Sequence, residues 1–434
     1  MNSHLQASRR AVLAFGVLAL WLAAAPASSF AQATVFAEGL TNPSGIYVDD
    51  NGYLWVASLG TGLDDAGVYV VTPAGEVHPF MAGLPSTLVM GEPSGASHVY
   101  FNNDIELIVV QGEGARPESG SVFTVDTTGF TPGDDPLATG DIGEIFAISQ
   151  FVTGELAGGQ SNPFAMTFVP NSDVAYVSDA AANAIVQGDD GGLSILAQFP
   201  NIVNTGSVGP PAVNAVPTGL DYHDGTIYVG MLTGFPFNEG AASIRAVDTE
   251  GNVSIYLGDL TTVVDLQVIP GGGGIVFLEH RFAPNAGILY KYENEELTEM
   301  ATGLDRPVGL RIGHNGEVYV SLLTKGQIVV VEGVVTDAKR ELPERSQSTR
   351  VEAYPNPFSD GVNLAVDVTE AGPASLTIVD VLGRTVHREE SARLEAGTQR
   401  LRWDGVASGR IAPGTYLYRV EVGGSVVDGV VVKQ

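Results

Sequence analysis

The stretch RPVGLRIGHNGEVYVS, residues 306–321, contains the pattern that decides the fold. A proline opens a short apolar strand, a polar turn with glycine follows, and a second strand ending in YVS comes next. Two short strands joined by an Asn-Gly turn are typical of a β-hairpin. A single hairpin cannot bury its apolar faces alone, so this pattern favours a chain built from several copies.

Six copies of the pattern occur along the chain. They are NPSGIYVDDNGYLWVAS from residue 42, EPSGASHVYFNNDIELIVV from 92, NPFAMTFVPNSDVAYVSD from 162, VPTGLDYHDGTIYVG from 216, VVDLQVIPGGGGIVFLE from 263 and the copy quoted above from 306. Most copies start about 43 to 54 residues apart, which is the period of propeller repeats. The second and third copies are further apart, and we interpret the segment 129–161 between them as an insertion.

Each copy continues into a third strand, and several end in a fourth that closes on Gly-Leu, such as VHPFMAGL at 77–84. Four strands per repeat indicate the blades of a β-propeller. The last repeat lacks its fourth strand, whereas TVFAEGL at 34–40 has the pattern of one. We therefore predict an all-β protein with a six-bladed propeller over residues 34–336, its ring closed by the N-terminal strand. Copies two and five are degenerate, so five or seven blades are the alternatives.

Composition and charge exclude several classes of protein. The chain has 434 residues, no cysteine and a formal net charge of −29. Without cysteine there are no disulfides and no thiolate-bound metal. Most of the negative charge lies in residues 34–340, and such an acidic surface repels phosphate backbones, so we expect no nucleic-acid partner. No P-loop, Rossmann fingerprint or G-x-S-x-G elbow occurs in a suitable context, and we expect no nucleotide cofactor.

The N-terminus is typical of a signal peptide. Arg9 and Arg10 precede an apolar run over 11–25, and small residues follow up to position 33. The alternative is a membrane anchor, but a spanning helix needs about 20 apolar residues. We predict a signal peptide over 1–33 and no transmembrane segment after its cleavage.

A second module follows a polar linker at 337–350. Residues 351–434 contain short alternating strands separated by Gly-containing turns, which predicts a small immunoglobulin-like β-sandwich. We expect Trp403, Tyr416 and Tyr418 to pack inside it.

The motifs of this module are similar to a known family. YPNPF (354–358), IVDVLGRTV (378–386), LRWDGVASGRIAPGTYLYRVEVGG (401–424) and the terminal VVVKQ resemble the type A C-terminal sorting domain of type IX secretion clients. The resemblance implies the type IX secretion machinery as a partner and a secreted or cell-surface location. An ordinary carbohydrate-binding or spacing module is the alternative.

The propeller segments 91–99, 161–166, 216–243 and 261–266 are similar to the ScyD/ScyE family, whose fold is of the NHL or lactonase-like class. The founding members belong to gene clusters for a cyanobacterial sunscreen pigment, but relatives occur in many other bacteria. The resemblance therefore implies a fold without specifying a chemistry. Two functions stay open: a ligand-binding or scaffold propeller for a small molecule or surface glycan, and a metal-dependent enzyme, lactonase-like or pigment-related.

Aligned repeats suggest one metal site. Asn42, Glu92 and Asn162 each precede a proline, and the fifth repeat offers Asp265 nearby. Oxygen ligands of these types suit Ca²⁺ or Mg²⁺, and lactonase-like propellers hold a metal in a comparable place. The alternative is that these side chains cap turns at the blade edges. His98, His223, His280 and His314 show no H-x-H or H-x-x-x-H spacing, so no tight zinc site is expected, although His98 and His280 could converge in the channel.

The stretch YVGMLTGFPFNEGAAS at 228–243 has an aromatic, proline-containing turn where small polar residues are usual. It is predicted to join the second and third strands of the fourth blade. Phe235 and Phe237 either plug the gap to the neighbouring blade or form, with Arg306, a lip that binds a ligand.

Overall fold

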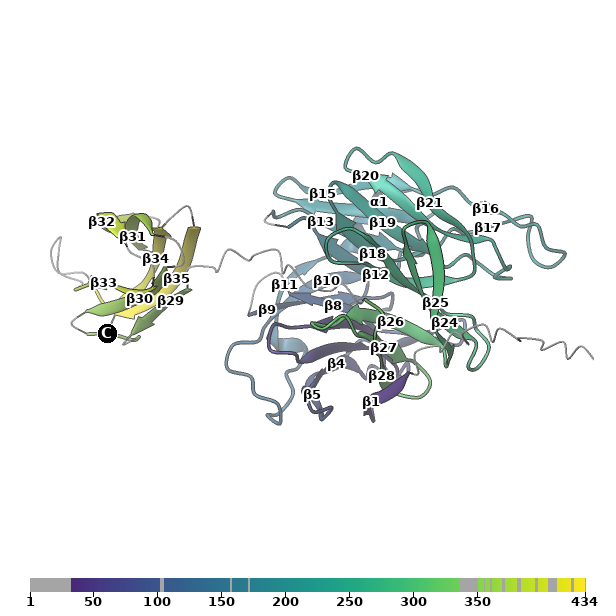
Figure 1. Cartoon of the computed structure of the whole chain (residues 1–434), viewed down its shortest axis with the longest axis horizontal. Coiled ribbons are helices and arrows are strands. Elements are labelled where there is room, and N and C mark those ends of the chain that lie inside the picture. Colours follow the sequence, from purple (N-terminus) through teal and green to yellow (C-terminus); the bar gives the residue numbers. More distant parts are fainter. Residues whose placement is uncertain are drawn as a thin grey trace, which may run out of the picture.

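The computed structural model describes residues 33–335, except 102–104, 157 and 171, and residues 350–433, except 355, 360, 369–370, 381–383, 395–396, 405–411 and 423–424. The predicted signal peptide and linker lie almost wholly outside the described residues. Two separate β-modules are present (Figure 1). No helix among the described residues has the length and hydropathy needed to cross a bilayer.

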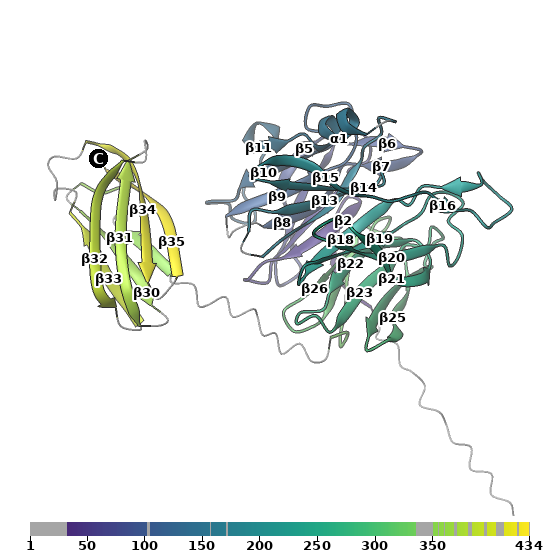
Figure 2. The same cartoon turned by 90° about the horizontal axis from the view of Figure 1, so that it is seen from above.

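The first module is a six-bladed β-propeller, which confirms the predicted fold and excludes five or seven blades. Its blades are four-stranded antiparallel sheets (Figures 1 and 2). From the inner to the outer strand, blades 1 to 3 are β2 (Pro43–Val48), β3 (Leu54–Ser58), β4 (Ala66–Val71) and β5 (Val77–Leu84); β8 (Ala96–Phe101), β9 (Glu106–Gln111), β10 (Ser121–Asp126) and β11 (Ile142–Phe146); and β12 (Pro163–Phe168), β13 (Ala175–Asp179), β14 (Ala184–Asp189) and β15 (Gly192–Gln198). Blades 4 to 6 are β18 (Pro217–His223), β19 (Thr226–Met231), β20 (Ala242–Asp248) and β21 (Val253–Leu260); β22 (Val263–Val268), β23 (Gly274–Glu279), β24 (Gly287–Glu293) and β25 (Glu296–Leu304); and β26 (Pro307–Ile312), β27 (Val318–Leu322), β28 (Gln327–Val331) and β1 (Thr34–Glu38).

The ring closes through the N-terminal strand. β1 pairs antiparallel with β28, with Thr34 opposite Val330 and Glu38 opposite Gln327. The six inner strands contact one another in ring order, β2, β8, β12, β18, β22, β26 and back to β2. The first and last segments of the propeller therefore share one blade, and no inner strand is left at an open edge.

The segment 129–161 is not a simple insertion. Its residues Ile142–Phe146 form β11, the fourth strand of blade 2, and α1 (Ile148–Glu155) follows. The short helix η1 (Thr139–Asp141) precedes β11. The sequence pattern missed β11 because its residues are mostly exposed and lack the Gly-Leu ending of the other outer strands. Two small hairpins lie outside the blades: β6 (Thr87–Val89) with β7 (Glu92–Ser94), and β16 (Ile202–Val203) with β17 (Ala212–Val213).

The second module is the predicted β-sandwich. One sheet contains β29 (Arg350–Tyr354), β30 (Val362–Val368) and β33 (Gly397–Trp403), and the other contains β32 (Thr385–Leu394), β31 (Gly372–Asp380), β34 (Gly414–Val422) and β35 (Ser425–Lys433). Trp403, Tyr416 and Tyr418 are buried in its core, as predicted, and Trp403 packs edge-on against both Phe358 and Tyr416.

Candidate functional site

A repeated backbone hydrogen bond aligns the six inner strands. The first residue after the second strand donates its N–H to the carbonyl of the residue that precedes the inner strand. The six accepting carbonyls belong to Asn42, Gly95, Asn162, Val216, Thr262 and Arg306. Gly95 rather than Glu92 is thus the equivalent position in blade 2, and Asp265 lies three residues further into its strand. The sequence alignment was wrong at Glu92 because β7 precedes the true inner strand of blade 2.

These six residues and the connections between second and third strands mark one end of the central channel. We call this end the upper mouth. The connections between first and second strands mark the lower mouth. The third residue after each aligned position is Gly45, His98, Ala165, Gly219, Asp265 or Gly309. Only blades 2 and 5, which lie opposite each other in the ring, carry a large side chain there.

His98 and Asp265 meet inside the channel. His98 Nε2 lies 3.6 Å from Asp265 Oδ2, and the two residues are 3% and 5% exposed. A Cβ on Gly45 would come within 2.4 Å of the His98 ring, and one on Gly219 would come within 2.2 Å of Asp265 Oδ1. The pair therefore fits because neighbouring blades have glycine at this level.

The partners of this pair determine where a proton lies. His98 Nδ1 is 2.9 Å from the carbonyl oxygen of Phe164, which can only accept, so Nδ1 carries a hydrogen. Asp265 accepts bonds from the N–H groups of Leu310 (2.7 Å) and Leu266 (2.9 Å). Asp265 is therefore held in place by two backbone donors, and its Oδ2 also faces His98 Nε2.

A ring of polar side chains lies below the pair. The fifth residue after each aligned position is polar in every blade: Tyr47, Tyr100, Thr167, Asp221, Gln267 and Arg311. Five of these side chains contact the backbone or a side chain of the next blade: Thr167 contacts Asp221, Asp221 contacts Val268, Gln267 contacts Ile312, Arg311 contacts Tyr47, and Tyr100 contacts Met166. Burial, and then the charge of Asp265, raises the pKa of Tyr100 above its usual value. Burial also raises the pKa of Asp221, and the nearby charge of Arg311 acts in the opposite direction.

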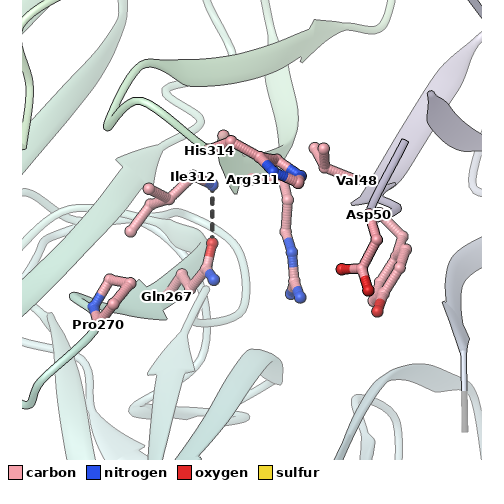
Figure 3. A pocket seen from close by; sticks show the side chains of 9 residues that line it. Val48, Asp50, Gln267, Pro270, Arg311, Ile312 and His314 are labelled. Carbon is pink, nitrogen blue, oxygen red and sulfur yellow. Dashed lines mark hydrogen bonds between the residues drawn. The ribbon is translucent and has the colours of Figure 1, made fainter. Parts of the chain in front are cut away.

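The polar ring opens into a hollow of about 90 Å³ at the lower mouth (Figure 3). Its polar lining comes from Tyr47, Asp50, Gln267, Arg311 and His314 on blades 1, 5 and 6. The guanidinium carbon of Arg311 lies 4.8 Å from the centre of the Tyr47 ring. The oxygen of the Gln267 side chain accepts the N–H of Ile312 at 2.8 Å, so its amide nitrogen is left to face the hollow.

The four predicted cation ligands have different surroundings. Asn42 donates to the carbonyl of Gly60 at 2.7 Å, and Asn162 Oδ1 accepts the N–H of Glu113 at 3.0 Å. Glu92 forms an ion pair with Arg306 at 2.5 Å, which links a predicted ligand to a predicted lip residue. Asp265 belongs to the pair with His98. Among the described residues, no group of three or more His, Cys, Asp or Glu side chains is arranged to hold a metal ion. A site that combines two asparagines with two acids stays a prediction.

His280 lies at the upper mouth, apart from His98. It is 5% exposed, its Nδ1 is 2.9 Å from the carbonyl of Pro307, and no partner among the described residues meets its Nε2. Burial lowers the pKa of His280 to about 4, and the hydrogen bond to Pro307 opposes this only partly. The imidazole is therefore neutral at physiological pH.

Replacing His280 by asparagine is expected to remove a pH dependence of stability. The ordinary pKa of histidine is 6.5, so between pH 6.5 and 4 the unfolded chain binds a proton that the folded chain does not. The free energy of unfolding of wild type, relative to that of the variant, should therefore fall by about 3 kcal/mol as the pH drops from 7 to 4. Urea unfolding at several pH values measures this, with His78→Asn, a more exposed histidine, as the control. A constant difference across the range would contradict the prediction.

The two phenylalanines of the aromatic turn of blade 4 have different surroundings. It joins β19 to β20, at the upper mouth side of the blade. The ring of Phe237 stacks at 4.1 Å on Phe282, which belongs to the corresponding connection of blade 5. Phe235 is 60% exposed. Phe237 thus packs as the plug interpretation requires, whereas Phe235 is free to contact a ligand.

Sequence reasoning did not find the polar ring or the lower-mouth hollow. A signal was present, because every ring residue follows its aligned backbone position by five residues. Using it required the correct register in blades 2 and 5, where no proline marks the first residue of the inner strand.

The fold and channel define a propeller with a sorting module, and the comparisons agree. A model of the secretion system C-terminal sorting domain matches residues 352–433. The chain is therefore a type IX secretion client, located at the cell surface or in the medium. No curated protein matches the chain.

Several solved structures are similar to part of the chain at low sequence identity. A protein of unknown function from Bacteroides thetaiotaomicron is 12% identical, with 69% of this chain and 71% of that chain covered and a TM-score of 0.46. The calcium-binding protein regucalcin from Agrobacterium tumefaciens is 11% identical, with 70% and 94% covered and a TM-score of 0.45. The PQQ-bound aldose sugar dehydrogenase from Streptomyces coelicolor is 12% identical, with 70% and 98% covered and a TM-score of 0.44.

Proposed function

We propose that the propeller is a ligand-binding module, exported by its sorting domain, that takes up a polar group of a small molecule or a surface glycan at the lower mouth. One observation carries the proposal: all six inner strands have a polar residue at the same level, and three of these residues, Tyr47, Gln267 and Arg311, line the lower-mouth hollow. Packing alone would favour apolar side chains at such a crowded level, because buried polar groups need partners. Convergent polar groups in a concavity are the usual form of a small-molecule site.

Blocking the hollow should abolish ligand binding without unfolding the protein. We expect at least one class in a panel of neutral sugars, hydroxy acids and amino acids to raise the melting temperature of the secreted chain. Val48→Trp places an indole at a residue that lines the hollow, so this rise should disappear. Val35→Trp, at an exposed site on β1, should retain it. A rise that survives Val48→Trp, or no rise with any class, would count against the proposal.

The alternative function is a metal-dependent enzyme acting on a small organic molecule. It rests on Asn42, Glu92, Asn162 and Asp265 as ligands for Ca²⁺ or Mg²⁺, and on a lactonase-like or ScyD/ScyE-like ancestry of the propeller. Elemental analysis of the purified protein decides it, because bound Ca²⁺ or Mg²⁺ is a condition of this function.

A further inference from the structure

We propose that the group bound at the lower mouth is a carboxylate, held by the guanidinium of Arg311 and the side-chain amide of Gln267. This inference rests on the proposed ligand-binding function and names its ligand class. It follows from three observations: Arg311 forms no ion pair with a described carboxylate, the amide of Gln267 has a fixed orientation, and the hollow is small.

Arg311 differs from most arginines of this acidic propeller. Among the described propeller residues, Arg116, Arg281 and Arg306 each form an ion pair with a carboxylate. For Arg311, no carboxylate of the described residues lies within the 4.0 Å that defines an ion pair. Its guanidinium carbon instead lies 4.8 Å from the centre of the Tyr47 ring, a cation–π contact that holds the side chain without using its N–H donors. A fixed, planar fork is suited to binding a carboxylate through two parallel hydrogen bonds.

Asp221 lies near Arg311 but is held by other donors. Its carboxylate accepts the N–H of Val268 at 2.9 Å, the N–H of Tyr222 at 2.9 Å and the hydroxyl of Thr167 at 3.4 Å. Arg311 acts on Asp221 through its nearby charge, but the two form no ion pair. The N–H donors of Arg311 are therefore left for a ligand.

Gln267 supplies a second, oriented donor. Its oxygen is used by the N–H of Ile312, which leaves the amide NH₂ group directed to the side of the hollow where Arg311 lies (Figure 3). An acceptor placed between Arg311 and Gln267 receives hydrogen bonds from both. A neutral hydroxyl offers a single oxygen to these donors and no charge, whereas the two oxygens of a carboxylate can use the full set.

The hollow limits the size of the group. A volume of about 90 Å³ holds several water molecules, since about 10–15 Å³ on the same measure is enough for one. It accommodates a carboxylate and one or two attached carbons. The remainder of a larger ligand, such as an acidic sugar, would extend out of the lower mouth.

The test uses fluoroacetate and its neutral isostere fluoroacetamide as probes, observed by ¹⁹F NMR on the whole secreted chain. Fluoroacetate is expected to bind, and Arg311→Gln should weaken it at least ~10-fold, the effect of losing one charge-assisted pair. Arg245→Gln is the matched control, since Arg245 likewise forms no ion pair within the described part of the chain and lies away from the hollow, on β20. Its affinity should equal that of wild type.

Three results would overturn the inference. Equal binding of fluoroacetamide and fluoroacetate would retain the ligand site but remove the carboxylate assignment. Displacement of fluoroacetate by sulfate or phosphate but not by acetate would assign the site to a tetrahedral oxyanion. Binding that persists unchanged in Arg311→Gln would place the probe elsewhere, and the Val48→Trp variant then shows whether the hollow binds any ligand.

Discussion

Gly45→Ala is expected to lower the free energy of unfolding of the propeller by about 3 kcal/mol. The new Cβ would lie 2.4 Å from Cδ2 of His98 and 2.8 Å from its Cα. A flexible side chain could move away, but the Cα belongs to the inner strand β8 and is held by its ladder to β9. The clash must therefore be relieved by separating two neighbouring blades at the channel. Equilibrium unfolding in urea, followed by tryptophan fluorescence, measures the loss.

The control for this substitution is Gly154→Ala. Gly154 lies in α1, and a Cβ there meets no atom within 4 Å. Alanine favours a helix over glycine by about 1 kcal/mol, so this variant should be as stable as wild type or slightly more stable. If Gly45→Ala behaved in the same way, the close approach of blades 1 and 2 would be refuted.

Asp265→Ala is expected to lower the free energy of unfolding by about 3 kcal/mol, because it removes a buried carboxylate that accepts two backbone N–H groups at the channel axis. The change leaves His98 Nε2 without its carboxylate and removes the acceptor of the Leu310 and Leu266 N–H groups. All of these groups lie inside the channel, where water cannot readily replace the lost partner.

The matched control is Asp248→Ala. Asp248 also accepts two backbone N–H bonds, from Glu250 and Asn252, but it does so in an exposed turn. We expect a much smaller loss of stability there than for Asp265→Ala, because solvent can satisfy the freed donors. A double-mutant cycle with His98→Ala then isolates the pair, with an expected coupling of about 1–3 kcal/mol. Additive single effects would show that His98 and Asp265 do not interact.

The axial pair also has a consequence for the site. His98 and Asp265 are both buried at the channel axis, on the upper side of the polar ring. Under the proposed function, a ligand would therefore reach the polar ring from the lower mouth, where the hollow lies.

The sequence predicted the architecture better than the site. Proline and glycine at the start of the inner strands, together with the orphan strand at 34–40, were sufficient to predict six blades. The sorting module was recognised because its motifs are local. The cation ligands were chosen by a register that the structure corrects in blade 2, where Gly95 occupies the position assigned to Glu92.

What the sequence alone determined is therefore the repeat, its strand pattern and the exported character of the chain, because these depend on residues close together along the chain. Only the tertiary structure decided which side chains meet at the axis. His98 and Asp265 are separated by 167 positions, and Tyr47 and Arg311 by 264, and each pair is brought together only when the ring closes. Their chemistry depends on burial and on glycines contributed by other blades, and neither is visible in a local pattern.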